Sequence, residues 1–287
     1  MSSSSMMGRI TIASILLCTL WLTAYAGGGP EPDPGQIARA YVDARKASLA
    51  FPEIFANGQS HSDASLYAVQ RQYVELLLKE EGLTVGGYKG GFIPKASVGG
   101  VLFAEGILKG TPTLKRSNFY NLLVEAEIAF QFCDTIEQPL ADVAALQART
   151  CNVFPAIELP DAALENLDDL LSDFSQLRQA LVPKNMVVAK VLIGEAKNPQ
   201  DLDLNRLDIK VAHNGTKIGY REGASSTSDI WSRVLWVVND FVIGRGYKID
   251  AGHIIIPGAL TGLHQGKPGQ YNVDYGSLGA VEFRIEP

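Results

Sequence analysis

The chain has 287 residues, enough for one large domain or two small ones with a substantial core. Hydrophobic residues make up 46% of it, which is typical of a globular protein and excludes general disorder. The formal net charge is -6 and the chain contains no basic run, so nucleic acid is excluded as the main partner, because phosphate binding needs clustered Lys and Arg.

The N-terminal segment has the pattern of a secretory signal peptide. Arg9 precedes an apolar run over 10–22, and Ala24-Tyr25-Ala26 supplies small residues for cleavage. The run is shorter than the ~20 residues that a transmembrane helix needs. We therefore expect cleavage after Ala26, export to the periplasm or the medium, and no stable membrane span afterwards. An uncleaved membrane anchor is the alternative. A flexible tether is expected over 27–35.

Helices are expected first along the mature chain, and strands dominate after them. Apolar positions recur at helical spacing over 36–51, and Ser62 is a plausible N-cap for a second helix ending near Gly82. Later segments are rich in glycine, β-branched and aromatic residues, which favours strands. Strands are expected at 86–91, 100–104, 122–132, 185–193, 207–213, 216–223, 253–257 and 281–285, and further helices at 139–149, 168–180 and 228–244. Strands and helices do not alternate regularly along the chain. The expected fold class is therefore α/β of the α+β kind, with an antiparallel or mixed β core and peripheral helices.

Two cysteines, Cys133 and Cys151, remain after the signal peptide, and they bracket the expected helix at 139–149. A disulfide can form in an exported protein. Joining them would close a loop worth ~3 kcal/mol on the loop-entropy model. Two separate buried thiols are the alternative.

Three glutamates, Glu125, Glu127 and Glu158, stand inside otherwise apolar strand-like segments. Burying an unpaired carboxylate costs several kcal/mol, and neither segment contains Lys or Arg, so a bound metal is the leading interpretation. Alternation places Glu125 and Glu127 on one face of a strand, and the apolar face opposite is expected to meet the core. Three oxygen ligands favour Mg²⁺ or Mn²⁺ over zinc and leave positions open for a chelating 2-oxo acid. Glutamates that face solvent on an edge strand are the alternative.

The remaining polar motifs are weaker. His61, His213, His253 and His264 show no ligand spacing, and only His264 lies near the candidate site in sequence; each is expected to be an ordinary loop or strand residue. Asn214-Gly215-Thr216 has the form of a glycosylation sequon, but we expect a type I′ hairpin turn there.

Six segments along the chain form an ordered set of motifs: Asp63-Ala64-Ser65-Leu66-Tyr67-Ala68-Val69-Gln70, Gly87-Tyr88-Lys89, Gly100-Val101-Leu102-Phe103, Val124-Glu125-Ala126-Glu127-Ile128-Ala129, Pro155-Ala156-Ile157-Glu158 and Gly258-Ala259-Leu260-Thr261-Gly262. In order and content they resemble the motifs of 2-keto-4-pentenoate hydratases, a group of the fumarylacetoacetate hydrolase (FAH) superfamily. The match spans 36–285, nearly all of the mature chain. The chain therefore resembles this group, and the Glu-x-Glu with a later third Glu is the most specific element.

The resemblance implies a mixed β-sandwich roll with peripheral helices, in which 36–84 is an N-terminal helical segment and 85–287 the catalytic domain. It implies Mg²⁺ or Mn²⁺ on Glu125, Glu127 and Glu158, with Lys89 at the catalytic lysine position. Substrate contacts are expected from Asn185, Leu260 and Thr261, and we expect a homo-oligomer. The implied reaction is water addition to a 2-hydroxydienoate with tautomerisation to the 2-oxo acid. Without the resemblance, Lys89 would be read as a solvated loop residue.

The chain also departs from the hydratase pattern. The acidic residue that usually precedes the Gly-x-Leu-Phe motif is missing, since this stretch reads Ala96-Ser97-Val98-Gly99. Of the Asp-Asn-Ala-Ser segment only Asn185 survives, and Pro257 replaces a threonine. A hydrolase or decarboxylase on the same scaffold is therefore one alternative. An exported relative that binds metal and a small carboxylate without turnover is the other.

Overall fold

A computed structural model describes residues 33–55, 60–94, 96–165, 167–223 and 229–287. The predicted signal peptide and most of the predicted tether lie outside these residues. The end of the predicted tether is helical instead, because Asp33 caps the first described helix and Pro34 opens it. Among the described helices, none combines the length and apolar character needed to cross a membrane.

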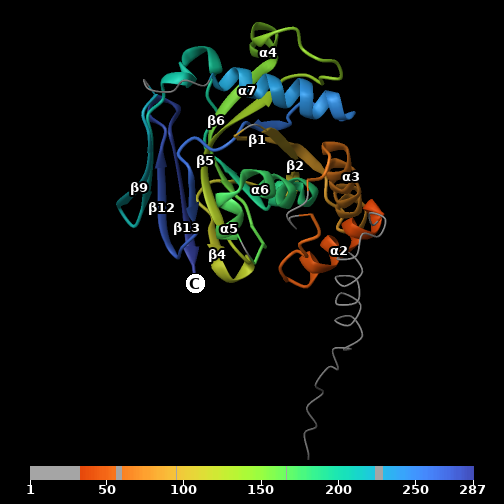
Figure 1. Ribbon diagram of the computed structural model, residues 1–287. Coiled ribbons are helices and arrows are strands. Elements are labelled where there is room, and N and C mark those ends of the chain that lie inside the picture. Colours follow the sequence, from red (N-terminus) through yellow and green to blue (C-terminus); the bar gives the residue numbers. More distant parts are fainter. Residues whose placement is uncertain (1–32, 56–59, 95, 166, 224–228) are drawn as a thin grey trace, which may run out of the picture.

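Two β-sheets form the centre of the molecule (Figure 1). The first, sheet A, has the strand order β2-β1-β10-β5-β6-β7-β3, with β11 paired to β5; the second, sheet B, has the order β4-β13-β12-β8-β9. Sheet A contains β1 Val85–Ile93, β2 Ala96–Phe103, β3 Ile107–Lys109, β5 Leu123–Phe132, β6 Thr150–Leu159, β7 Lys190–Ile193, β10 Ile254–Ile256 and β11 Leu263–Gln265. Sheet B contains β4 Thr113–Lys115, β8 Ile209–His213, β9 Thr216–Arg221, β12 Gly269–Asp274 and β13 Ala280–Glu286. Both sheets combine parallel and antiparallel pairs, which confirms the predicted mixed β core.

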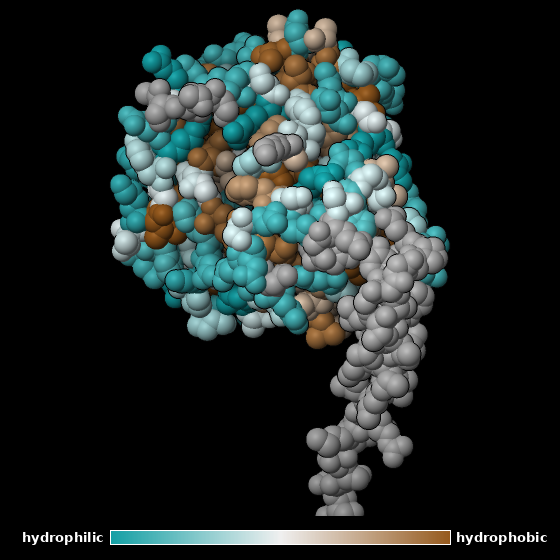
Figure 2. All heavy atoms as spheres, in the orientation of Figure 1, coloured by the Kyte–Doolittle hydropathy of each residue, from teal (hydrophilic) through white to brown (hydrophobic). Residues whose placement is uncertain are grey.

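Helices cover the sheets from the outside. They are α2 Pro34–Lys46, α3 Asp63–Glu80, α4 Val143–Arg149, α5 Leu167–Ser172, α6 Phe174–Leu181 and α7 Ile230–Trp236. Ser62 caps α3 as predicted, because its hydroxyl accepts a hydrogen bond from the backbone N–H of Ser65. Figure 1 shows α2 and α3 on the side of β5 and β6 opposite to sheet B. On the face shown in Figure 2, apolar residues form small patches that hydrophilic residues separate.

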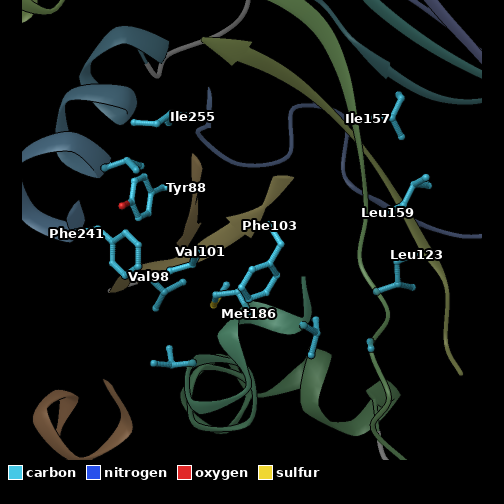
Figure 3. Packing of buried hydrophobic residues seen from close by; sticks show 14 of the residues in the cluster. Tyr88, Val98, Val101, Phe103, Leu123, Ile157, Leu159, Met186, Phe241 and Ile255 are labelled. Atoms are coloured by element: carbon cyan, nitrogen blue, oxygen red, sulfur yellow. The ribbon is translucent and has the colours of Figure 1, made fainter. Parts of the chain in front are cut away.

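Sheet A is apolar on both faces. One face packs into the main core, and Figure 3 shows part of that packing around Tyr88, Val101 and Phe241. The opposite face is here called the glutamate face, because Glu125, Glu127 and Glu158 lie on it. It carries a second buried cluster, formed by Leu102, Ala129, Phe154, Ala156, Val191, Ile193, Ile254 and Ile256. The prediction that the apolar face opposite the glutamates meets the core is confirmed, but the glutamates also stand at the edge of an apolar interior. The solvent-facing edge-strand alternative is wrong, because Glu127 and Glu158 are fully buried.

Three predicted elements differ from the structure. The strand expected at 185–193 begins only at Lys190, because Asn185, Met186 and Val187 adopt left-handed backbone angles that end a turn over 182–187. The helix expected at 168–180 is two helices, since Asp173 leaves the helical conformation and caps α6. The helix expected at 228–244 is present from Ile230 to Arg245 but changes type along its length, because α7 is followed by a π turn and a 3₁₀ turn. The short strands β3, β4 and β11, and the longer β12, were not predicted.

The predicted hairpin at Asn214-Gly215 is confirmed. It joins β8 to β9, and its two residues have φ angles of 49° and 75°, as a type I′ turn requires.

The structure joins Cys133 to Cys151, with their Cα atoms 5.2 Å apart and 18 residues apart in sequence. The link ties the end of β5 to the start of β6, the two strands that carry the glutamates. Removing it with Cys133→Ser and Cys151→Ser together is expected to cost about 3 kcal/mol on the loop-entropy model, or about 6–12 °C in Tm for a chain of this size. Thermal unfolding of both proteins measures the loss. An unchanged Tm, or an intact mass that reductant leaves the same, would contradict the link.

Candidate metal centre

The three glutamates meet on one face of two neighbouring strands. Glu125 of β5 lies directly opposite Glu158 of β6 in the antiparallel register, and Glu127 lies opposite Ala156. One carboxylate oxygen from each of the three lies within 4.8 Å of the others. Glu127 and Glu158 are fully buried and Glu125 is half-buried. The strand pairing therefore brings all three predicted metal ligands together.

Lys89 supplies the positive charge at this cluster. It lies on β1 beside Ile256 of β10, is 5% exposed, and donates from Nζ to Oε1 of Glu158. Neither glutamate segment contains a Lys or Arg, and the structure brings this cation from another strand. The alternative reading of Lys89 as a solvated loop residue is wrong.

Burial and mutual repulsion dominate the electrostatics of the cluster. Burial, then the charge of Glu158, raises the pKa of Glu125 to about 7, against the opposing effect of Lys89. Burial, together with the charges of Glu158 and Glu125, raises the pKa of Glu127 well above its usual range. Burial also raises the pKa of Glu158, while Lys89 lowers it. The negative charge exceeds what one ammonium neutralises, so the ionised cluster favours a further cation.

The donor set fits a hard divalent cation. Oε1 of Glu127 and Oε2 of Glu158 are buried and have no hydrogen-bond partner in the described part of the chain. Such orphaned acceptors are costly, and converging carboxylate oxygens are the ligands that Mg²⁺ and Mn²⁺ prefer.

The segment 258–262 borders the glutamates. The backbone N–H of Gly258 donates to Oε2 of Glu127 at 2.7 Å, and that of Leu260 donates to the carbonyl of Ala126 at 2.8 Å. The hydroxyl of Thr261 is buried and has no hydrogen-bond partner among the described residues. Leu260 and Thr261, predicted to contact substrate, thus lie along β5 at the metal ligands; their binding role stays a prediction.

Comparison with known proteins agrees with this geometry. No family model matches the chain. It is 26% identical over 251 residues to a 2-oxo-hept-4-ene-1,7-dioate hydratase of Escherichia coli, a match that covers 84% of this chain and 91% of that protein. The 4-oxalocrotonate decarboxylase from Pseudomonas putida G7, complexed with magnesium and adipate, superposes with a TM-score of 0.76 at 20% identity, covering 88% of this chain and 97% of that one. A fumarylacetoacetate hydrolase family protein from Yersinia pestis CO92 gives a TM-score of 0.54 at 15% identity, with 71% and 94% covered.

The chain has the fold of the FAH superfamily. Its sequence resembles the hydratase group of that superfamily, so the predicted resemblance and fold class are confirmed. Within this FAH fold, the three glutamates and Lys89 form one cluster that Leu260 and Thr261 border, while Asn185 has different surroundings.

Asn185 serves the backbone of the FAH fold. Its Oδ1 accepts from the N–H of Val101 at 2.7 Å and its Nδ2 donates to the carbonyl of Val101 at 2.8 Å, in a buried position. Both ends of the amide are therefore engaged by β2. A contact of Asn185 with substrate stays a prediction.

Replacing Asn185 by alanine is expected to destabilise the protein by about 2 kcal/mol or more, because two buried polar groups of Val101 lose their partner. Alanine also tolerates the left-handed backbone at this position less well than asparagine does. Urea unfolding measures the change, with Asn118→Ala, at an exposed position, as the control. Equal losses in the two variants would show that the bonds to Val101 contribute nothing.

The position of the missing acid is apolar in the structure. Val98 is 1% exposed and lies opposite Gly91 on the same hairpin as Lys89. A Cβ at Gly91 would meet both Val98 and Met186, so Met186 fills the neighbouring space, and Figure 3 shows these two side chains on one side of β2. Among the described residues, no acid beyond the three glutamates joins the cluster. Beside the three candidate metal ligands, Lys89 is thus the charged group at the cluster that can exchange a proton.

The histidines are not part of the cluster. His264 lies opposite Val124 on β11, so its ring points to the face of β5 away from the glutamates and approaches Gly219 of sheet B. His213 stacks on Tyr271, Nδ1 of His253 accepts from the N–H of Asp250, and His61 contacts the ring of Phe55. This agrees with the prediction that they are ordinary loop or strand residues.

Tyr275 is a buried neighbour that sequence reasoning missed. Its hydroxyl donates to the carbonyl of Ala156, the residue paired with Glu127. This bond joins the segment after β12 to β6 at the level of the metal ligands. The residue follows β12, a strand that was not predicted, so nothing in the sequence pointed it toward the glutamates.

The pKa of Glu125 predicts a pH effect on the metal-free protein. Because the folded pKa is about 7, above an ordinary value of 4.5, the contribution of Glu125 to stability is fully present at low pH and is lost as pH rises through about 7. With chelator present, the wild type should therefore gain at least about 3 °C in Tm relative to Glu125→Gln on going from pH 8 to pH 5.5. The lowered pKa values of His253 and His264 make the stability of the protein change with pH in the opposite direction. Both proteins contain these histidines, so their effect is the same in each and drops out of the comparison. A wild-type curve parallel to that of the variant would contradict the assignment.

Proposed function

We propose that the protein is a divalent-metal-dependent hydro-lyase that adds water to a 2-hydroxydienoate and yields a 2-oxo acid. The observation that carries this proposal is the convergence of Glu125, Glu127 and Glu158 beside Lys89 in a buried, mostly apolar site. The similarity to a 2-oxo-hept-4-ene-1,7-dioate hydratase supports the substrate class. A 2-oxo-4-pentenoate type of acid is the simplest candidate.

Glu125, Glu127 and Glu158 would hold Mg²⁺ or Mn²⁺, which when bound supplies charge stabilisation for an enolate oxygen. The chain contributes the positioning of these ligands. The N–H of Gly258 fixes one oxygen of Glu127, and the β5–β6 register fixes the separation of Glu125 and Glu158. Such prior positioning reduces the reorganisation needed when charge develops on the substrate.

Lys89 has two chemical roles open to it at this position. Its ammonium can bind the carboxylate of the acid, and its Nζ can give a proton to, or take one from, the carbon skeleton. The carboxylates of the cluster raise the pKa of Lys89 against the opposing effect of burial, so the ammonium form is favoured when the site is metal-free. The apolar residues of the glutamate face limit water at the site, which strengthens these interactions.

A spectrophotometric assay tests the proposal. Purified mature protein with Mg²⁺ or Mn²⁺ is mixed with 2-hydroxypenta-2,4-dienoate, and the dienoate absorbance should fall with formation of the hydrated 2-oxo acid, identified by mass. Chelator should stop the reaction, and Glu127→Gln is the matched inactive control. No turnover across a panel of 2-oxo acids and dienoates, with metal bound, would overturn the hydro-lyase proposal.

A second candidate function is a binder of metal and a small carboxylate without turnover. The buried Val98, in the stretch where hydratases of the resembled group carry an acidic residue, favours it. Calorimetric binding of a non-reacting dicarboxylate together with Mn²⁺, in a protein that fails the absorbance assay, would support this candidate.

Export and assembly also remain proposals. We propose cleavage after Ala26 and a periplasmic or secreted mature chain, supported by the sequence pattern alone. N-terminal sequencing of expressed protein should start at Gly27, and retention of residues 1–26 would overturn cleavage.

We also propose a homo-oligomer, and light scattering that gives the mass of a single chain would overturn it.

A further inference from the structure

A methionine covers the β1–β2 hairpin next to Lys89. Gly91 follows Lys89 by two residues on β1 and Gly100 lies opposite Lys89 on β2, so both glycines belong to the face from which the Lys89 side chain extends. A Cβ at Gly91 would lie 3.1 Å from Cε of Met186, and a Cβ at Gly100 would lie 3.2 Å from Cβ of Met186. The Met186 side chain therefore occupies the space that these two glycines leave open beside Lys89.

This methionine lies close to the segment that fixes a metal ligand. A Cβ at Gly258 would lie 3.9 Å from Cα of Gly91, and the backbone N–H of Gly258 donates to Oε2 of Glu127 at 2.7 Å. Gly91 thus has Met186 on one side and the segment bonded to Glu127 on another. Met186 is 5% exposed, and its thioether forms an apolar wall of the metal centre next to Lys89.

The backbone holds this wall firmly. Asn185, Met186 and Val187 have φ angles of 53°, 55° and 49°, a left-handed conformation that is unfavourable for side chains with a Cβ and persists only where the surroundings hold it. The amide of Asn185 bonds both backbone groups of Val101, and the carbonyl of Val187 accepts the N–H of Asp161 at 3.1 Å. The turn is therefore clamped on both sides of Met186, and moving its backbone would break these hydrogen bonds.

The interior below the metal centre has no room for a ligand. Each member of the second buried cluster on the glutamate face is at most 7% exposed. An acid bound through its polar end at the glutamates and Lys89 must therefore extend its tail along the walls of the centre. Met186 is the wall beside Lys89, and its position is fixed by the clamped turn.

We propose that Met186 is a specificity-determining residue, which limits the length of the apolar tail on the acid that the metal centre accepts. A short tail packs against the thioether, whereas a long one collides with it. Met186 has this role only if the centre takes a 2-oxo or 2-hydroxydienoic acid, so the inference rests on the proposed function.

Binding of two saturated 2-oxo acids tests the role of Met186 without turnover. 2-Oxobutanoate and 2-oxooctanoate share the chelating end and differ only in the length of the apolar tail, and each is titrated calorimetrically into protein loaded with Mn²⁺. The wild type should bind 2-oxooctanoate more weakly than 2-oxobutanoate, although a longer apolar tail ordinarily strengthens binding. Met186→Ala should bind 2-oxooctanoate at least about tenfold more tightly than the wild type, with less than about a threefold change for 2-oxobutanoate.

Two variants serve as controls. Val187→Ala changes the next residue of the same turn, whose side chain lines a pocket at the end of α2, and both affinities should equal those of the wild type. Met186→Leu keeps the apolar volume of the wall and should keep the wild-type ratio of the two affinities. The comparison of the two acids in the wild type needs no variant, so the test holds even if Met186→Ala folds poorly.

Three results would overturn the role of Met186. They are wild-type protein that binds 2-oxooctanoate as tightly as 2-oxobutanoate, an unchanged ratio of affinities in Met186→Ala, and the same change of ratio in Val187→Ala. Failure of both acids to bind would overturn the proposed substrate class and the role of Met186 together. An expected shift in the binding ratio without any turnover of the dienoate would support the role of Met186 and overturn the hydro-lyase reaction alone.

Discussion

Replacing Glu127 by glutamine is expected to lower the turnover of the dienoate by about a thousandfold or more. A glutamine keeps the size of the side chain but removes the charge that the cation needs. A bound divalent ion stabilises the transition state by several kcal/mol, and each 1.36 kcal/mol of lost stabilisation lowers the rate tenfold. The absorbance assay at saturating Mg²⁺ measures the loss.

Stability distinguishes this effect from misfolding. The metal-free Glu127→Gln protein should be at least as stable as metal-free wild type at pH 8, because a buried and repelled carboxylate has been neutralised. Thermal unfolding with chelator checks this. A variant that loses activity together with several degrees of Tm would indicate a structural role for Glu127 instead.

Replacing Lys89 by methionine is expected to reduce turnover by about 10²–10⁴-fold, the usual range for loss of a proton-transferring group. The affinity for Mn²⁺ should be retained or improved, because the ammonium of Lys89 no longer pairs with Glu158. Kinetics at several metal concentrations separate the two effects.

Lys89→Arg separates the two roles of the residue. Arginine keeps the positive charge but does not release a proton near neutral pH. Turnover within about tenfold of the wild type would assign Lys89 to binding the substrate carboxylate, whereas a loss equal to that of Lys89→Met would assign it to proton transfer. Wild-type turnover in both variants would remove Lys89 from the mechanism.

The sequence was informative where a residue type contradicts its surroundings. Carboxylates inside apolar strands predicted the Glu125, Glu127 and Glu158 cluster, because period-two alternation and burial cost are local rules. The ion pair of Lys89 with Glu158 could not be found in this way. It depends on β10 lying between β1 and β5, a strand order that no local pattern encodes.

The errors in the fold have a similar origin. Segment 185–193 reads as a strand from its β-branched residues, but the bonds of Asn185 to Val101 hold the backbone in a left-handed turn. Tertiary hydrogen bonds thus override local propensity. Short pairings such as β11 on β5 contain too few residues to show alternation, although β11 passes beside Glu125.

Titration of Mn²⁺ into metal-free protein, followed by electron paramagnetic resonance of the free ion, tests the three-glutamate site most directly. The wild type should bind one Mn²⁺ per chain, and Glu125→Gln, Glu127→Gln and Glu158→Gln should each bind it at least about tenfold more weakly, because each loses a charged ligand. Unchanged Mn²⁺ binding in these variants would contradict the metal centre.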